Sequence, residues 1–375
     1  MMGLRFHFCF LVLCACLILP ITQCLAQTCL PEELAALFIF GDSLFDAGNN
    51  NYINTTTNFQ ANVWPYGETF FKYPTGRASN GRLIPDFIAE YAKLPLVLPY
   101  LHPAYPRYTD GANFASAGAG ALNVESSSRR GWVIDLNTQL KYFKNMETVL
   151  KRTLGEAQTK KLLSRAVYLF SIGTNDYAAP FSTNSSLLRF STHEEYVDMV
   201  IGNFTTVIKE IHRKGGRKFG FLNLPPAGYF PSTKAIMPEN SEEITALVKR
   251  HNKALSHALQ ILTSQLEGFK YSYTNLYNFI TEGMNNPLKY GFKEGKMGCC
   301  GSGPYRGIQS CGGKRSIKDQ YELCGNPSEY LFFDSAHPSE KANEQLAKLL
   351  WNGNLDVTWP YNLKALFGQK QSEIN

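Results

Sequence analysis

The sequence predicts one α/β domain with three layers, in which helices cover both faces of a central parallel sheet. Short apolar runs that end in loops alternate along the chain with longer segments whose apolar residues recur at helical spacing. No change of composition, internal repeat or low-complexity linker divides the chain. Strands of a parallel sheet are continuous apolar runs because both of their faces are buried. We therefore expect one domain within residues 27–375, with its core from about Ala35 to about Phe367.

The first half of the chain begins with a predicted strand. Leu34–Phe40 is a short apolar run that ends at Gly41, as expected of a buried strand leading into a loop. Leu83–Tyr91 has apolar residues at helical spacing and predicts a helix, and Ala112–Ala115 predicts a second strand. Between Gln139 and Leu163 the pattern predicts two amphipathic helices.

The second half continues the alternation. Ala166–Ile172 is rich in strand-forming residues and predicts a third strand, and His193–Lys214 predicts a long amphipathic helix that stops at Gly215. The remaining predicted elements are, in order, the strand Lys218–Leu224, the helix Glu242–Leu266, the strand Lys270–Leu276 and the helix Pro338–Trp351, with Pro338 in its first turn.

The N-terminus has the pattern of a targeting segment. Arg5 precedes the apolar run Phe8–Leu19, and Cys24-Leu25-Ala26 offers small residues for a signal peptidase, so we expect residues 1–26 to be a cleaved signal peptide. The run is too short for a transmembrane helix, and no later run reaches the required length. We predict a secreted, extracellular protein with no transmembrane segment. Entry into the secretory pathway is also compatible with the cell wall, the vacuole or the lumen of the endoplasmic reticulum.

Charge argues against a nucleic-acid partner. The 375 residues include 37 basic and 31 acidic side chains, a formal net charge of +6, and the basic residues form no long block. A nucleic-acid-binding surface gathers its basic residues on one face or stripe. Nothing in the sequence marks an oligomeric state.

Five cysteines remain after the predicted cleavage site. Cys299, Cys300, Cys311 and Cys324 lie close together, and Cys29 stands alone near the new N-terminus. A zinc site would require paired Cys-x-x-Cys or Cys/His spacing, which is absent, so we expect no metal. In an oxidising compartment, disulfides that tie a loop are favoured. The connectivity stays open, and the odd cysteine is free or paired elsewhere.

Three Asn-x-Ser/Thr triplets predict glycosylation and agree with secretion. They begin at Asn54, Asn184 and Asn203. Such triplets also occur by chance.

Three predicted strands end in loops that carry groups useful for acyl transfer. In a parallel sheet the functional groups gather at the carboxyl ends of the strands. Ser43 supplies a hydroxyl after the first strand, Gly118 an unobstructed backbone N–H after the second, and Asn175 an amide donor after the third. Each also has a structural interpretation. A serine there is commonly a helix cap, and glycine and asparagine are common in turns.

A candidate base lies near the other end of the chain. Asp334 precedes His337 by three residues, so both side chains can face one side of a turn. The carboxylate can then fix the imidazole tautomer that accepts a proton from Ser43. In the competing interpretation, Asp334 caps the last helix and His337 merely opens it.

Four ordered blocks carry a resemblance to a known family. The chain resembles the plant GDSL esterase/lipase family, a branch of the SGNH hydrolases, and the clustered cysteines around Cys299-Cys300-Gly301 are similar to that branch. The blocks are Phe40–Asn50, Asn113–Gly120, Gly173–Asp176 and Asp334–Pro338. A Gly-x-Ser-x-Gly elbow is absent, which disfavours an α/β-hydrolase lipase.

The resemblance implies a fold and a mechanism. The fold would be the three-layer, flavodoxin-like SGNH hydrolase fold with its central parallel sheet. The catalytic residues would be Ser43, Asp334 and His337, and the oxyanion would be held by the Ser43 and Gly118 N–H groups and the Asn175 amide. No metal or other cofactor is expected.

The predicted function is a secreted serine esterase/lipase that acts on a small-molecule ester or lipid through an acyl-serine intermediate, in lipid metabolism. Three alternatives stay open. The same residues could make an acyltransferase if the pocket admits an alcohol, or a carbohydrate (acetyl) esterase. A non-catalytic secreted binding protein could keep the fold without the chemistry.

Overall fold

A six-stranded sheet, in the order β10-β5-β4-β3-β1-β2, forms the centre of the structure. Neighbouring strands are parallel except at one edge, where β10 is antiparallel to β5. The bounds are β1 Leu37–Gly41, β2 Gly111–Asn113, β3 Val167–Ser171, β4 Lys218–Leu222, β5 Lys270–Thr274 and β10 Thr358–Pro360. The parallel strands have the order 2-1-3-4-5 of flavodoxin-like sheets. All five predicted strands are confirmed, with ends shifted by a few residues.

The computed structural model describes residues 36–104, 107–122, 132–183, 192–313 and 321–368. These described residues belong to one compact unit. The predicted signal peptide and Cys29 lie outside the described residues, and so does the triplet at Asn184. Among the described residues, no helix combines the length and apolar character needed to cross a bilayer.

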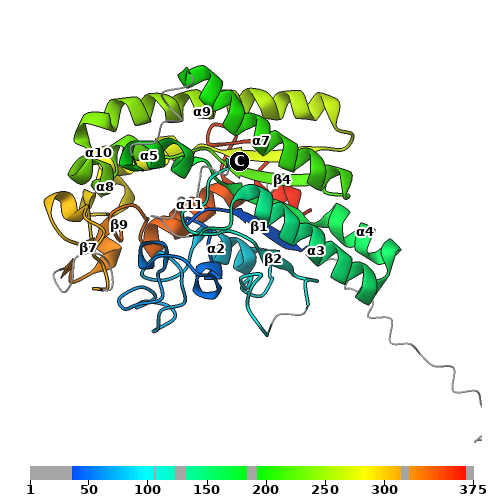
Figure 1. The fold of residues 1–375 in the computed structure, drawn as a ribbon, viewed down its shortest axis with the longest axis horizontal. Coiled ribbons are helices and arrows are strands. Elements are labelled where there is room, and N and C mark those ends of the chain that lie inside the picture. The colour runs from blue at the N-terminus through cyan, green and yellow to red at the C-terminus, as the bar shows by residue number, and fades with distance from the viewer. Residues whose placement is uncertain (1–35, 105–106, 123–131, 184–191, 314–320, 369–375) are drawn as a thin grey trace, which may run out of the picture. The chain divides into compact units, whose positions relative to one another are not determined.

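Helices cover both faces of the sheet, as the sequence predicts (Figure 1). On one face α3 packs on β1 and α7, and α7 packs on α9, while on the other α2 packs on α11 and α12 packs on β4 and β5. The bounds are α2 Ile84–Tyr91, α3 Leu136–Leu154, α4 Glu156–Arg165, α7 His193–Arg213, α9 Ser241–Gln265, α11 Glu340–Asn352 and α12 Leu363–Leu366. Short 3-10 helices lie at Asn49–Tyr52, Thr57–Phe59, Ala227–Tyr229, Pro238–Asn240, Pro287–Tyr290, Pro304–Arg306 and Pro327–Glu329.

Two features of the helices differ from the sequence prediction. The last long helix starts at Glu340, because Ser339 is its N-cap and accepts from the Ala342 N–H, so Pro338 precedes the helix. Three helices near the carboxyl ends of the strands were not predicted, and they are α5 Thr174–Thr183, α8 Pro231–Ile236 and α10 Leu276–Asn285. Pro180 in the interior of α5 weakens its helical pattern, and α8 has only 6 residues, too few to show a helical period.

Aromatic rings form the core beneath the helical layer of α3 and α7. Register places Phe38, Tyr168 and Phe219 side by side on adjacent strands, with ring centroids 5.5 and 5.3 Å apart. Phe143 of α3 packs edge-on against Phe38, and Phe204 of α7 packs against the next row of rings. Residues two apart share a strand face, so the next row of rings, Phe40, Phe170 and Phe221, packs on the same side near the ends of the strands.

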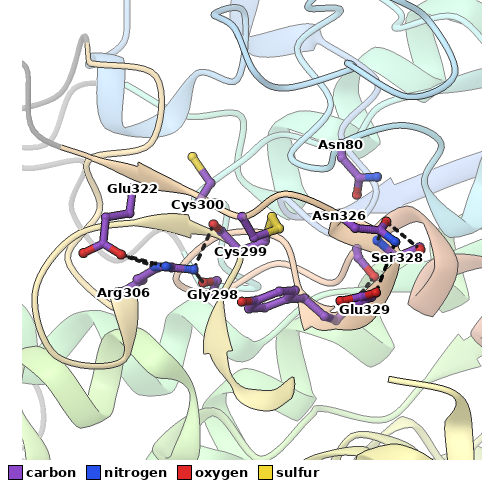
Figure 2. Close-up of a disulfide and its surroundings, with 12 residues drawn as sticks. Asn80, Gly298, Cys299, Cys300, Arg306, Glu322, Asn326, Ser328 and Glu329 are labelled. Carbon is purple, nitrogen blue, oxygen red and sulfur yellow. Dashed lines mark hydrogen bonds and ion pairs between the residues drawn. A yellow bond between two sulfur atoms is a disulfide. The ribbon is translucent and has the colours of Figure 1, made fainter. Parts of the chain in front are cut away.

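In the cysteine-rich segment, residues 294–332, the described residues form two small sheets. In it β6 (Glu294–Gly298) pairs with β9 (Tyr330–Phe332), and β7 (Cys300–Gly301) pairs with β8 (Glu322–Leu323). Two disulfides, Cys299–Cys324 and Cys300–Cys311, confirm the predicted use of the clustered cysteines and supply the pairing that the sequence left open. Figure 2 shows Arg306 between Glu322 and the carbonyls of Gly298 and Cys299, beside the first disulfide.

Candidate active site

The structure brings the loops after β1, β2 and β3 together at the carboxyl edge of the sheet. β1 lies between β2 and β3, so successive connections leave it in opposite directions and a crevice opens there. Ser43 follows β1, Gly118 follows β2, and Asn175 lies in the first turn of α5 after β3. All three line one pocket of about 230 Å³, and His337 lines it with them.

Ser43, His337 and Asp334 form a continuous hydrogen-bonded chain. The Ser43 Oγ lies 2.7 Å from His337 Nε2, and His337 Nδ1 lies 2.8 and 2.9 Å from the two Asp334 carboxylate oxygens. The Asp334 side chain is 2% exposed and the His337 side chain 15%. A carboxylate on Nδ1 holds the proton there, which leaves Nε2 as the acceptor that faces the serine hydroxyl.

Asp334 shapes its own turn and does not cap the last helix. Its Oδ1 accepts the backbone N–H groups of Ala336, at 2.9 Å, and His337, at 2.8 Å. The Phe333 N–H donates to the His337 carbonyl at 2.8 Å and closes the turn. Since α11 begins later and Ser339 caps it, the interpretation of Asp334 and His337 as a helix start is wrong.

The candidate oxyanion donors line the same pocket as Ser43 and His337. Gly118 has φ +85°, and a Cβ there would lie 2.6 Å from the Phe59 ring, so both backbone and space require glycine. The Asn175 Nδ2 donates to the Ala119 carbonyl at 2.9 Å, which orients the amide. An amide nitrogen has two N–H groups, so one stays available for a ligand in the pocket.

Gln139 holds the strand end that precedes Ser43. Its Oε1 accepts the Gly41 N–H at 2.9 Å, and its Nε2 donates to the Gly41 carbonyl at 2.8 Å. The side chain is fully buried in α3. From the sequence, Gln139 has no predicted role beyond the start of a helical segment. A glutamine on the apolar face of a helix is a signal of such a buried hydrogen bond.

Buried carboxyl groups tie the three loops to one another. Asp46 accepts the Gly48, Asn49 and Ala117 N–H groups at 2.7, 2.6 and 2.9 Å, which joins the first loop to the second. Asp176 accepts the N–H groups of residues 121 and 122 and joins the third loop to the second.

Burial also changes the acidity of these groups. Desolvation raises the pKa of Asp46 to about 6 and that of Asp176 to about 7. It also raises the pKa of Asp42, the residue before Ser43, to about 6. None of these carboxyl groups was assigned a role from the sequence.

The pocket wall is mostly apolar. Among the described residues that line it, none is a lysine, arginine or glutamate, and Asn58, Gln60 and Gln309 are among its polar members. The large apolar residues of the lining that follow β4 in the chain are Phe230, Ile236, Met237, Leu276 and Ile280. In the part of the chain that the structure describes, no group of three or more His, Cys, Asp or Glu side chains could hold a metal ion.

Two of the predicted glycosylation sites lie within the described residues. Asn54 is exposed in the loop between two 3-10 helices. Asn203 lies in α7, where its Nδ2 donates to the Ala121 carbonyl and its Oδ1 accepts from Asn137 at 3.3 Å. A glycan on Asn203 would have to replace the contact with Ala121, so Asn54 is the better candidate.

Comparison with known proteins places the site in a family context. Residues 37–350 match the family model described as GDSL-like Lipase/Acylhydrolase. The chain is 52% identical over 351 residues to GDSL esterase/lipase 1 of Arabidopsis thaliana, across 92% of this chain and 93% of that protein. It is 51% identical over 364 residues to a GDSL lipase of Tanacetum cinerariifolium, across 96% of this chain and 94% of that protein.

Proposed function

The chain belongs to the GDSL-like lipase/acylhydrolase family and is a serine esterase/lipase, and we propose that Ser43, His337 and Asp334 are its catalytic residues. The observation that carries this assignment is the hydrogen-bonded chain from Asp334 through His337 to the Ser43 hydroxyl, at the wall of the pocket. A nucleophile, a base and a group that orients the base are the parts that acyl transfer needs.

The proposed reaction has two halves. The Ser43 Oγ attacks the ester carbonyl carbon while His337 Nε2 takes its proton. The Ser43 and Gly118 N–H groups and the Asn175 amide stabilise the resulting oxyanion. As the tetrahedral intermediate collapses, His337 donates its proton to the departing alcohol and an acyl-serine remains. Water then attacks the acyl group with His337 again as base, which releases the carboxylic acid and restores Ser43.

The proposed substrate is an uncharged ester with an alkyl acyl chain, such as a lipid. The lining residues that follow β4 in the chain offer hydrocarbon contact, and the described lining has no lysine or arginine to pair with a phosphate or carboxylate. The chain belongs to an acylhydrolase family, and no observation favours the alternative of a non-catalytic binding protein.

We also propose that residues 1–26 are a signal peptide and that residues 27–375 form one secreted hydrolase domain. The two disulfides in the described residues support passage through an oxidising compartment. Expression with the native N-terminus should release a protein that begins at Gln27, as N-terminal sequencing would show. A protein retained in the cytosol with an intact N-terminus would contradict this proposal.

The first experiment compares hydrolysis of p-nitrophenyl acetate, butyrate and laurate by the wild type and Ser43→Ala. We expect release by the wild type that rises beyond acetate and is lost in the variant. Activity confined to acetate would favour the acetyl esterase alternative, and a variant as active as the wild type would remove Ser43 from the mechanism. Adding a primary alcohol and analysing products separates hydrolysis, which yields acid, from acyl transfer, which yields a new ester.

A further inference from the structure

Tyr66 contacts the candidate catalytic carboxylate from outside the pocket. Its phenolic hydroxyl donates to Asp334 Oδ2 at 2.7 Å, although the two residues are 268 positions apart in the sequence. Tyr66 is fully buried and does not line the pocket. Its contact with the candidate catalytic residues is therefore the hydrogen bond to Asp334.

The packing around Tyr66 holds its hydroxyl in place. Its ring stacks edge-on against Phe333, the neighbour of Asp334, with centroids 5.4 Å apart. The backbone is tied on both sides, because the Tyr66 N–H donates to the Val63 carbonyl and the next residue's N–H donates to the Ser79 carbonyl. Tyr66 also belongs to a buried cluster that includes the disulfide-bonded residues Cys299, Cys300 and Cys311. Such a setting leaves the side chain little rotational freedom.

The hydrogen bonds on Asp334 are divided between its two oxygens. The backbone N–H groups of its own turn reach Oδ1, and Tyr66 reaches Oδ2. His337 Nδ1 lies nearly equidistant from both oxygens, at 2.8 and 2.9 Å. Donors at both ends fix the plane of the carboxylate and therefore the direction in which it holds the imidazole. Donors to the charged form also favour ionisation of a carboxylate that burial penalises.

We propose that Tyr66 is a positioning residue for ester hydrolysis, which orients Asp334 and moderates its charge through the Oδ2 hydrogen bond. This proposal rests on the proposed function, because it assigns Tyr66 a part in the work of Ser43, His337 and Asp334. Without the hydroxyl, Asp334 keeps its turn but loses its alignment from one side. The carboxylate then carries a less neutralised charge beside the imidazole.

The test uses two variants that each remove one buried phenolic hydroxyl. Tyr66→Phe deletes the donor to Asp334 and keeps the ring on Phe333. Tyr168→Phe is the matched control, because the Tyr168 hydroxyl is equally buried and donates at 2.9 Å to the Leu163 carbonyl, outside the proposed catalytic set. Both variants lose a hydrogen bond of the kind that stabilises a fold, so the melting temperature of each should fall, and a melting curve shows that each is folded before its kinetics are measured.

The expected difference lies in catalysis. Tyr66→Phe should lower kcat for p-nitrophenyl butyrate by about tenfold, with KM changed less than about twofold, because a hydrogen bond to a charged group is lost outside the pocket. The acidic limb of its kcat/KM–pH profile should move to higher pH by about half a unit or more, since a less neutralised carboxylate favours the imidazolium. Asp42, whose carboxyl also interacts electrostatically with His337, is the same in both variants. Tyr168→Phe should keep the wild-type kcat and pH profile.

Each result decides the proposal. Loss of kcat with the shifted acidic limb in Tyr66→Phe alone supports it. A wild-type kcat and profile in folded Tyr66→Phe overturns it, and so does a Tyr66→Phe protein that fails to fold while Tyr168→Phe folds, because Tyr66 is then a stability residue. Wild-type activity in Ser43→Ala is a different outcome, since it overturns the proposed function itself.

Discussion

The two halves of the candidate active site are held in place by different means. Ser43, Gly118 and Asn175 follow strands of the main sheet, whose aromatic core is fully buried under long helices. Asp334 and His337 lie on a turn after β9, outside that sheet. Backbone N–H groups of the disulfide-bonded Cys299 and Cys300 donate to the carbonyls of the two residues before Asp334, at 3.0 and 2.7 Å.

The difference shows what each kind of support requires. A large apolar core positions loops without covalent help, because many buried side chains contribute to it. The cluster beneath Asp334 is small, and three of its buried members are disulfide cysteines. Small cores commonly need crosslinks to stay folded. We infer that the proposed nucleophile and oxyanion donors depend on hydrophobic packing, and that the proposed acid and base, Asp334 and His337, depend on two disulfides.

We expect the largest effect from removing Ser43, His337 or both, which tests whether the two halves act as one unit in catalysis. Ser43→Ala and His337→Ala should each lower kcat for p-nitrophenyl butyrate by roughly 10⁴-fold or more, and the double variant should be no slower than either. Each single change already removes the assisted nucleophile. Single-turnover and steady-state rates measure this, and effects that multiply in the double variant would contradict a shared mechanism.

Asn175→Ala tests the half that follows the main sheet. Loss of one oxyanion donor should cut kcat by roughly a hundredfold or more, with a smaller change in KM. The contact with Ala119 is lost as well, so a melting curve must accompany the kinetics. A folded variant with near wild-type turnover would remove Asn175 from the oxyanion role.

Removing a disulfide should weaken the region that carries Asp334 and His337 and leave the main sheet unchanged. The double variant Cys300→Ser with Cys311→Ser should lose about 3 kcal/mol of unfolding free energy, as expected for a crosslink of this loop length. Hydrogen exchange should rise in residues 294–337, while amides of β1, β3 and α7 keep their protection. Equal loss of protection in the main sheet would show that the two regions unfold together and that the comparison is wrong.

The pH dependence of stability should follow the half that contains Asp42, Asp46 and Asp176, the carboxyls whose pKa is raised. The pKa of Asp42 and of Asp46 rises to about 6 and that of Asp176 to about 7, above the ordinary value of 3.8, so the folded state binds these protons more tightly than the unfolded chain. Their contribution is fully present below that ordinary value and is lost progressively as the pH rises through the folded-state pKa values. Burial lowers the pKa of His251 to about 3, so this imidazole destabilises the folded state as the pH falls below its usual pKa. The three carboxyls outweigh this one imidazole.

We therefore expect the unfolding free energy to be higher at about pH 5 than at about pH 7.5, by an amount on the order of 1 kcal/mol. Urea denaturation at the two pH values measures it. A protein that is more stable at the higher pH would show that these carboxyls are not the dominant groups.

The sequence by itself predicted most of the regular structure. The five parallel strands and the long helices followed from periodicity, because a buried strand or an amphipathic helix records its environment in its own residues. The candidate residues Ser43, Gly118 and Asn175 stand out because they follow predicted strands, and Asp334 and His337 because they lie three residues apart. The sequence also indicated that the four clustered cysteines form disulfides.

Tertiary structure alone decided what depends on residues far apart in the chain. The antiparallel edge strand β10, only Thr358–Pro360, has too little pattern to be recognised, and its proline is tolerated because the strand lies at an edge. The pairing of the cysteines and the Tyr66 contact with Asp334 have no local signature, and the helix that carries Gln139 does not reveal Gly41 as its partner. Each is a contact between segments that only the packing of the whole domain brings together, and no periodicity within one segment can encode it.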